Sequence, residues 1–531
     1  IRLSLVGSEM CIRDSPSIFN DVIGPVMRGP SSSHTAASWR AARMSMDILK
    51  EPLKTAIIDF DKNGAWAPNY REQGTTLGID GGLLGIEMSD DRMKDTAKIA
   101  HQMGVSIHYE INSFQTTHIN TVRLNLTGVH GTSIEILAAS LGGGSVEIRK
   151  YNGFDVKLCG DYHEVLIMTH VTFDGAEKIK SLFPNLRSLS ESVLNNEKLY
   201  NVKLSKRVSK TVLRDLEKMV DFQKIISVNP VVPVISGNET TLPFTSIESM
   251  LNYAEENKLD LGAVGLLYEK YQSGLEESEV QEMMTGVVSL IENSIKIGLS
   301  GTIYKDRILP QQSHFIEQAE TSGKILQNSV VNHVIANVSA IMESKSAMEV
   351  VVANPTAGSC GAVGGVLRAV ADNIEASFND IIRAYFAAGL IGVYFAKGPG
   401  FSAEEHGCQV ECGASAGMAA AGIVQLFGGS AREAVDAASL AIQNMIGLVC
   451  DPIADRVEAP CLGKNVSAAM NALSSATMVR AGYNALIPLN EVIETVSSVS
   501  AQMPTCVKCT GKGGLAITKT ACAIKSQLSQ H

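Results

Sequence analysis

The sequence has few of the features that would assign a protein to a class at once. Aromatic residues make up only 5% of the 531 residues, whereas 46 glycines and 19 methionines suit close-packed helices. The net charge is −10, which disfavours a nucleic-acid partner because phosphate binding needs a basic face. The best apolar run, Ala384 to Ala396, has 13 residues, fewer than the roughly 20 that span a bilayer. We expect a cytoplasmic protein without a membrane partner, in which this run is a buried helix.

Spacings that mark zinc sites and secretion are also missing. There is no paired C-x₂-C and no C-x₂-C followed by H-x₃₋₅-H, and the single pair Cys506 and Cys509 is weak evidence by itself. The first fourteen residues lack both an initial Met and the apolar core of a signal peptide. We interpret residues 1–14, with Cys11, as an artefactual segment. The missing signal also argues against disulfides.

Cysteine is concentrated in one stretch of the chain. Residues 354–461 contain five of the ten cysteines, each beside Gly, Pro or Asn, residues typical of turns and helix ends: Cys360, Cys408, Cys412, Cys450 and Cys461. Thiolates at helix N-termini are stabilised by the helix dipole and can hold a soft metal. Inert buried cysteines are the competing interpretation. Spacing alone leaves both open.

A second motif precedes the helix predicted over 36–49. It reads Gly-Pro-Ser-Ser-Ser-His-Thr over residues 29–35. Ser hydroxyls and free backbone N–H groups at a helix N-terminus can bind a carboxylate or a phosphate. A plain N-cap is the alternative, and His34 is either an exposed histidine or an acid–base group.

The pattern of apolar residues predicts an α+β protein. We expect an α/β domain over 15–115, with a strand at 55–60, turns at 78–85 and a helix at 88–104. A small sheet of the amino-acid-sensing (ACT-like) kind is predicted over 116–190, with a helix at 133–141, and a connector over 191–245. From 246 to 531 we expect an all-α catalytic domain. Its helices are predicted at 247–256, 261–272, 280–298, 330–345, 363–375, 380–396, 414–427, 431–445 and 465–481.

Together these motifs resemble the iron–sulfur-dependent L-serine dehydratases. The resemblance runs from about residue 17 to 522 and is carried by 29–35, 82–85, 118–121, 354–361, 407–409, 447–452, 457–461 and 513–516. It implies an L-serine ammonia-lyase that forms 2-aminoacrylate, then pyruvate and ammonia. It also implies a single chain with fused beta and alpha domains, acting as a homodimer on L-serine.

The same resemblance implies roles for individual residues. Three cysteines would bind a [4Fe–4S] cluster and leave one iron open as a Lewis acid: Cys408, Cys450 and Cys461. The serines and histidine would bind the substrate carboxylate and take the Cα proton: Ser31, Ser32, Ser33 and His34. Five residues would line the other side of the substrate: Asn354, Thr356, Ser359, Cys360 and Lys464. Glu411 is a further candidate for orienting the substrate.

Some residues depart from the family pattern, and other functions stay open. Cys412 is a further possible ligand, Cys506 and Cys509 have no family role, and nine residues follow Cys522, which argues against inhibition by a terminal carboxylate. A lyase acting on threonine or cysteine and a non-catalytic amino-acid sensor are the alternatives. The chain lacks a recognisable lysine loop for pyridoxal phosphate.

Overall fold

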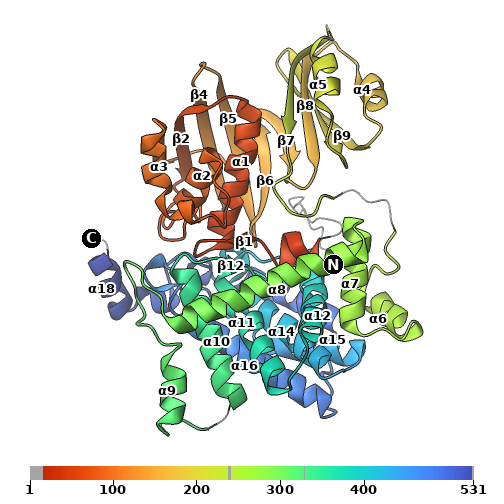
Figure 1. The fold of residues 1–531 in the computed structure, drawn as a ribbon. Coiled ribbons are helices and arrows are strands. Elements are labelled where there is room, and N and C mark those ends of the chain that lie inside the picture. The colour runs from red at the N-terminus through yellow and green to blue at the C-terminus, as the bar shows by residue number, and fades with distance from the viewer. Residues whose placement is uncertain (1–15, 220, 237–240, 328, 529–531) are drawn as a thin grey trace.

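The computed structural model describes residues 16–219, 221–236, 241–327 and 329–528. The expected artefactual segment therefore lies outside the described residues. Two sheets in the first half of the chain stand above a body of helices formed by the second half (Figure 1). This arrangement confirms the α+β prediction in its coarse form. No helix in the described ranges is both long and apolar enough to cross a bilayer.

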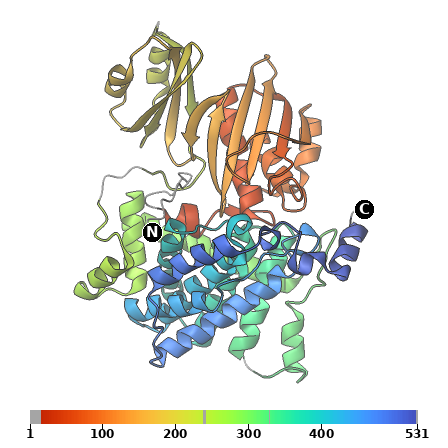
Figure 2. The ribbon, with the colours of Figure 1, turned by 180° about the vertical axis from the view of Figure 1, so that it is seen from behind.

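The larger sheet has six strands in the order β3-β2-β4-β5-β6-β7. Its strands are β2 (Leu53–Asp61), β3 (Ser106–Asn112), β4 (Thr121–Gly128), β5 (Ser133–Gly142), β6 (Ser145–Tyr151) and β7 (Phe154–Leu158). Only the β2–β3 pair is parallel. Three helices lie against one face of the sheet (Figure 1): α1 (Ala37–Leu49), α2 (Thr75–Leu84) and α3 (Thr96–Gln102). Seen from behind, the strands of the other face carry no helix among the described residues (Figure 2).

The smaller sheet has four strands in the order β11-β8-β10-β9. It is built from β8 (His163–His170), α4 (Ala176–Leu182), β9 (Leu186–Leu194), β10 (Glu197–Leu204), α5 (Lys210–Glu217) and β11 (Phe222–Val228). The βαββαβ order matches the kind of sheet that we expected, but its position differs. The range 116–190 is divided between the two sheets, and the expected connector 191–245 contains β10, α5 and β11. The sequence pattern shows strands but not which sheet they join, because pairing is decided by tertiary contacts.

Three local predictions were wrong. Residues 133–141, predicted as a helix, lie in strand β5. Buried Ile134 and Ile136 alternate there with exposed Ser133 and Glu135, and pairing with β4 overrides the local helix propensity. Residues 78–85 lie mostly in helix α2, whose glycines allow close packing on α1: a Cβ on Gly82 would lie 2.5 Å from the Trp39 carbonyl. In 88–104 only Thr96–Gln102 is α-helical, after a 3₁₀ turn.

The second half of the chain forms the helical body. All nine helices predicted there are present: α6 (Ile247–Glu256), α7 (Leu261–Ser273), α8 (Glu277–Ser300), α10 (Ser329–Ser346), α11 (Cys360–Asn373), α12 (Phe378–Lys397), α14 (Cys412–Leu426), α15 (Ala431–Gln443) and α16 (Cys461–Arg480). The sequence analysis missed α9 (Phe315–Thr321), α13 (Ala403–His406), α17 (Leu489–Gln502) and α18 (Lys519–Leu528). The run 384–396 is buried within α12 as predicted, except for Ala396 at its end.

The two parts of the molecule meet through the segment that precedes α1. Strand β1 (Val26–Met27) pairs antiparallel with β12 (Val351–Val352), so the N-terminal segment joins the helical body directly. The five-residue helix before it, Ile18–Val22, packs on α12, where Phe19 and Phe386 form an edge-to-face pair 6.5 Å apart. This junction places the residues after β1 beside those after β12.

Candidate active site and metal centre

Four of the five cysteines in 354–461 begin a helical element. Cys360 begins α11, Cys412 begins α14, Cys461 begins α16, and Cys408 begins the 3₁₀ turn Cys408–Val410. The prediction that these cysteines lie at helix ends is confirmed for these four. The free N–H groups and the positive end of the dipole at such positions favour a thiolate over a thiol.

The thiols come together in the interior. The Sγ atoms of Cys408 and Cys450 and a carboxylate oxygen of Glu411 lie within 4.8 Å of one another, a spacing that suits a shared metal centre. Glu411 Oε2 lies 3.7 Å from Cys408 Sγ, within hydrogen-bonding distance. Cys461 interacts with Cys408 through its charge and is buried as well. The structure thus brings Cys408 and Cys450 together with Glu411, and Cys461 stands beside them outside the 4.8 Å group.

Charge in this interior is concentrated on Cys408. Hydrogen bonds from the Cys412 and Cys450 thiols outweigh burial and hold the pKa of Cys408 well below its usual value. Burial opposes a charge on Lys464, but the Cys408 thiolate and Asp451 raise the pKa of that lysine. Burial lowers the pKa of Lys345, which donates to the Val457 carbonyl. A thiolate with cations nearby is the electrostatic environment of a metal-binding cysteine rather than of an inert one.

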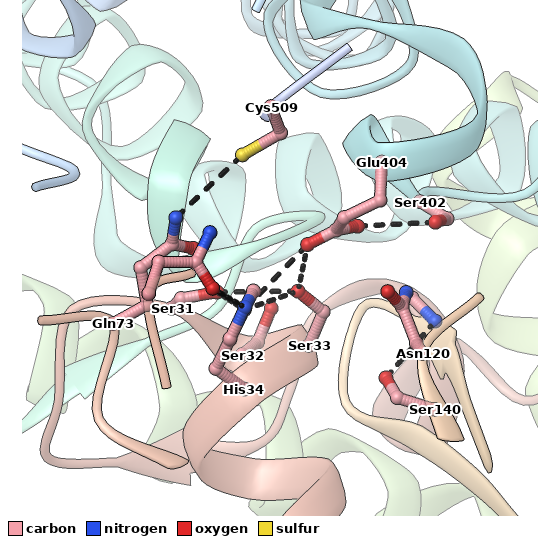
Figure 3. Close-up of polar contacts among 12 residues, drawn as sticks. Ser31, Ser32, Ser33, His34, Gln73, Asn120, Ser140, Ser402, Glu404 and Cys509 are labelled. Atoms are coloured by element: carbon pink, nitrogen blue, oxygen red, sulfur yellow. Dashed lines mark hydrogen bonds and ion pairs between the residues drawn. The ribbon is translucent and has the colours of Figure 1, made fainter. Parts of the chain in front are cut away.

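The serine and histidine motif forms a second buried network. Ser31 Oγ and Ser33 Oγ lie 3.1 and 3.2 Å from His34 Nδ1, and Ser33 Oγ donates to Glu404 Oε1 at 2.9 Å (Figure 3). With its amide oriented to satisfy all its neighbours, Asn69 donates to His34 Nε2 at 3.1 Å. A neutral His34 then carries its proton on Nδ1, the nitrogen that faces Ser31, Ser33 and Glu404. Burial lowers the pKa of His34, and the charge of Glu404 partly opposes this.

Hydrogen bonds connect this network to the thiol side. Ser32 Oγ accepts from the backbone N–H of Ala357 at 3.2 Å. In the same loop Thr356 Oγ1 donates to Glu411 Oε1 at 2.7 Å and lies 3.1 Å from Ser359 Oγ. Ser32, which is distant in the sequence from Thr356 and Ser359, therefore lies with them along one path that leads to Glu411.

Two buried amides among the described residues have no hydrogen-bond partner. Both side-chain polar atoms of Asn354 and of Asn120 lack a hydrogen bond to any described residue, and both residues are fully buried. Buried polar groups in native proteins are almost always satisfied, so such amides indicate a place for a polar ligand. Asn120 follows His118 and Ile119 in a motif that the sequence analysis quoted without giving it a role. Figure 3 shows it close to Ser140.

The remaining predicted residues lie farther from this position. Lys464 Nζ donates to the Val449 carbonyl at 2.7 Å and to Asp451 Oδ1 at 2.6 Å, which secures the loop that carries Cys450. Cys360 lies near Lys345, and burial raises the pKa of Cys360 to about 12. The sequence analysis did not anticipate Glu404, Asn69 or Gln73, because a single carboxylate or amide in a helical or loop segment carries no spacing signal.

Comparison with known proteins gives the family. The sequence model of the family described as serine dehydratase alpha chain matches residues 185–516. The chain belongs to this family. It is 32% identical to a probable L-serine dehydratase, alpha chain, of Bacillus subtilis, over 54% of this chain and 95% of that protein. It is 28% identical to an L-serine dehydratase of Streptomyces coelicolor, over 93% of this chain and 97% of that protein. A probable beta chain of Bacillus subtilis is 35% identical over 30% of this chain and 70% of its own length.

The donor set agrees with the iron–sulfur centre of serine dehydratases. Thiolate sulfur is the ligand that iron–sulfur clusters require, and the thiols of Cys408, Cys450 and Cys461 are buried. Lys464, whose pKa is raised, balances negative charge in the same interior. The residues present therefore fit a cluster held by cysteines.

Proposed function

We propose that this chain is an L-serine ammonia-lyase, a carbon–nitrogen lyase that removes water from L-serine to form 2-aminoacrylate. That product tautomerises and hydrolyses in water to pyruvate and ammonia. One observation carries the proposal: two buried groups of polar residues are connected where the sheet half and the helical half of the molecule join. The first group consists of the thiols and Glu411, and the second is the Ser31–His34 network with Glu404. The relatives of the chain are named serine dehydratases, and this family membership supports the same reaction here.

A [4Fe–4S] cluster would be held by Cys408, Cys450 and Cys461. When bound, it supplies an open, Lewis-acidic iron that lowers the pKa of the substrate hydroxyl and stabilises its departure. The chain's own groups must do the rest: bind the carboxylate, hold the amino acid in place and take the Cα proton.

Hydroxyl and amide groups would hold the substrate. The Ser31, Ser32 and Ser33 hydroxyls lie at the start of the helical segment that leads into α1, where backbone N–H groups favour an anion. The unpartnered amides of Asn354 and Asn120 supply donors and acceptors for the carboxylate and ammonium groups. Thr356 and Ser359 fix Glu411, whose burial raises its pKa well above the usual value.

His34 would be the proton acceptor. Its lowered pKa keeps the ring neutral near pH 7, as a base requires. The Nδ1 proton points to the Ser33 and Glu404 side, so Nε2 is the nitrogen that can accept the Cα proton. Because Asn69 donates a hydrogen bond to Nε2, Asn69 must move away before that proton is accepted. Glu404 would then stabilise the imidazolium through its charge.

The finer features of the molecule are part of the same proposal. The βαββαβ order of the four-stranded sheet supports an amino-acid-sensing sheet, here placed over 163–228. A homodimer in the cytoplasm is proposed as the working form. Light scattering on the purified enzyme, with and without L-serine, tests the dimer and any response of the assembly to the amino acid.

Anaerobic reconstitution with iron and sulfide tests the function. The sample should turn brown and release pyruvate from L-serine, and Cys450→Ala should abolish both the colour and the activity. Cys506→Ala, which removes an exposed cysteine, is the matched control and should keep both. Release of 2-oxobutyrate from threonine or of sulfide from cysteine, with no pyruvate from serine, would move the chain to the related lyases. A colourless protein that binds serine would be a sensor.

A further inference from the structure

Cys509 is a buried thiol that the proposed reaction does not use. It lies in the segment after the 3₁₀ turn Thr505–Val507, and its Sγ accepts a hydrogen bond from Gln73 Nε2 at 3.7 Å (Figure 3). With Ala403, Cys408 and Cys450 it forms a small buried cluster of its own. A thiol in this place is adjacent to the metal centre on one side and to the N-terminal network on the other.

The backbone holds Cys509 against Cys450. The Cys450 N–H donates to the Val507 carbonyl at 2.8 Å, and the Cys509 N–H donates to the Cys450 carbonyl at 2.9 Å. Cys450 and Lys508 form a bridge of the kind found between paired strands. Cys509 has φ +58°, uncommon for a residue with a side chain. The direct hydrogen bond between the two backbones holds Cys450 and Cys509 close, and both side chains belong to the same buried cluster.

We propose that Cys450 and Cys509 are a redox pair, which forms a disulfide when the chain has lost its cluster and meets a peroxide. This inference rests on the proposed function, in which Cys450 is a cluster ligand. Cys450 would then be withheld from the cluster until a thiol reductant releases it. The pairing also protects Cys450 from oxidation to the sulfinic acid, a step that cells rarely reverse.

The chemistry balances with hydrogen peroxide as the oxidant. One thiolate attacks peroxide, takes one oxygen to become a sulfenic acid, and hydroxide leaves as water after protonation. The second thiol attacks the sulfenic sulfur, the S–S bond forms, and a second water leaves. The two thiols lose two electrons in total, and peroxide accepts both.

Other cysteine pairs are poorer candidates. Cys408 also contacts Cys412 and Cys450. Cys408 and Cys412 are four residues apart in consecutive turns of helix, where a disulfide would distort the start of α14. Cys506 is exposed and three residues from Cys509. The segments of Cys408 and Cys450 are joined by a hydrogen bond between their neighbours Gln409 and Leu448, whereas Cys450 and Cys509 are bonded directly through their own backbone groups.

Peptide mapping of the full chain tests the pair directly. Trypsin separates the relevant cysteines, since cleavage after Arg and Lys gives peptides 433–456 with Cys450, 457–464 with Cys461, 481–508 with Cys506 and 509–512 with Cys509. Iron-free protein is treated with hydrogen peroxide, alkylated and digested without reductant. We expect 433–456 linked to 509–512, and loss of iron uptake until a dithiol is added.

Two variants sharpen the test. Cys509→Ser should lose the linked peptide and show sulfinic acid on 433–456, whereas Cys506→Ser, three residues away, should behave as the unaltered chain. The inference is overturned if peroxide leaves Cys450 alkylated as a free thiol or links it to Cys408 or Cys506. The peptide map of the unaltered chain tests the inference even if a variant fails to fold. Pyruvate release by untreated, reconstituted enzyme is measured separately, so failure of the lyase activity and failure of the redox pair are distinguishable.

Discussion

The two sides of the candidate site are built on opposite chemical principles. On the side of the helical body, sulfur and a buried carboxylate gather at the starts of helices, with Lys464 to balance their charge. On the side of the larger sheet, the hydroxyls of Ser31 and Ser33 and the imidazole of His34 form a network that meets Glu404 of the helical body. The first can hold a soft metal and the second can bind a carboxylate and move a proton. The reaction that we propose needs both, which is a physical reason for one chain to contain both parts.

Removing the base tests whether the two sides have separate roles. His34→Gln should lower the rate of pyruvate release roughly 10²–10⁴-fold, the usual contribution of a general base, because no ring nitrogen then takes the Cα proton. Iron content and visible absorbance should stay unchanged, since the polar partners of His34 among the described residues are Ser31, Ser33, Asn69 and Glu404, and none is a cysteine. A variant that loses its iron as well would show that the two sides are not independent.

Removing an unpartnered amide should have a smaller effect. Asn354→Ala removes the only groups that this residue offers to a ligand, and a hydrogen bond to a charged group contributes about 1.5–3 kcal/mol. We expect kcat/KM for L-serine to fall roughly tenfold to a hundredfold, mainly through KM. Asn257→Ala, at the exposed end of α6, is the control. An unchanged KM would mean that the amide faces no substrate group.

The charge of Glu404 should be visible in the pH profile. This carboxylate raises the pKa of His34 against the effect of burial, so Glu404→Gln should lower that pKa. A base works in its neutral form, and the acidic limb of the kcat/KM profile should therefore move to lower pH, with a modest loss of rate at the optimum. A shift toward higher pH would contradict the assignment of that limb to His34.

The four-stranded sheet should respond to pH without affecting catalysis. Burial raises the pKa of Glu164 from 4.5 to about 7, and its Oε2 accepts from Asn201 Nδ2 at 2.7 Å. A folded-state pKa above the unfolded one means that this part is most stable below pH 4.5 and loses stability as pH rises through about 7, by at most about 3 kcal/mol.

Glu164→Gln should remove this pH dependence. Hydrogen exchange of the β8 and β10 amides, compared between the variant and the unaltered chain at each pH, measures the difference. Below pH 6 the variant and the unaltered chain should have the same kinetics with L-serine. A difference in exchange that is constant with pH would show that Glu164 does not titrate in this range.

Sequence patterns predicted the helical half well and the sheet half less well. Each predicted helix, such as Ile247–Glu256, has apolar faces and helix-end residues close together in the sequence, so the signal is local. Residues 133–141 carry residues that suit a helix, yet they pair with β4 and β6. The division of 116–190 between two sheets depends on contacts distant in the chain. No local pattern contains that information.

The candidate site divides in the same way. The sequence by itself determined the residue types that the reaction requires: cysteines next to helix starts and a serine–histidine motif before α1, because both lie in short, contiguous motifs. Only the tertiary structure decided which of them meet. It brought Glu411 to Thr356 and Glu404 to Ser33, left the amides of Asn354 and Asn120 unpartnered, and set Cys509 against Cys450. Contacts between residues distant in the chain depend on the packing of the two parts, and packing follows from the whole chain.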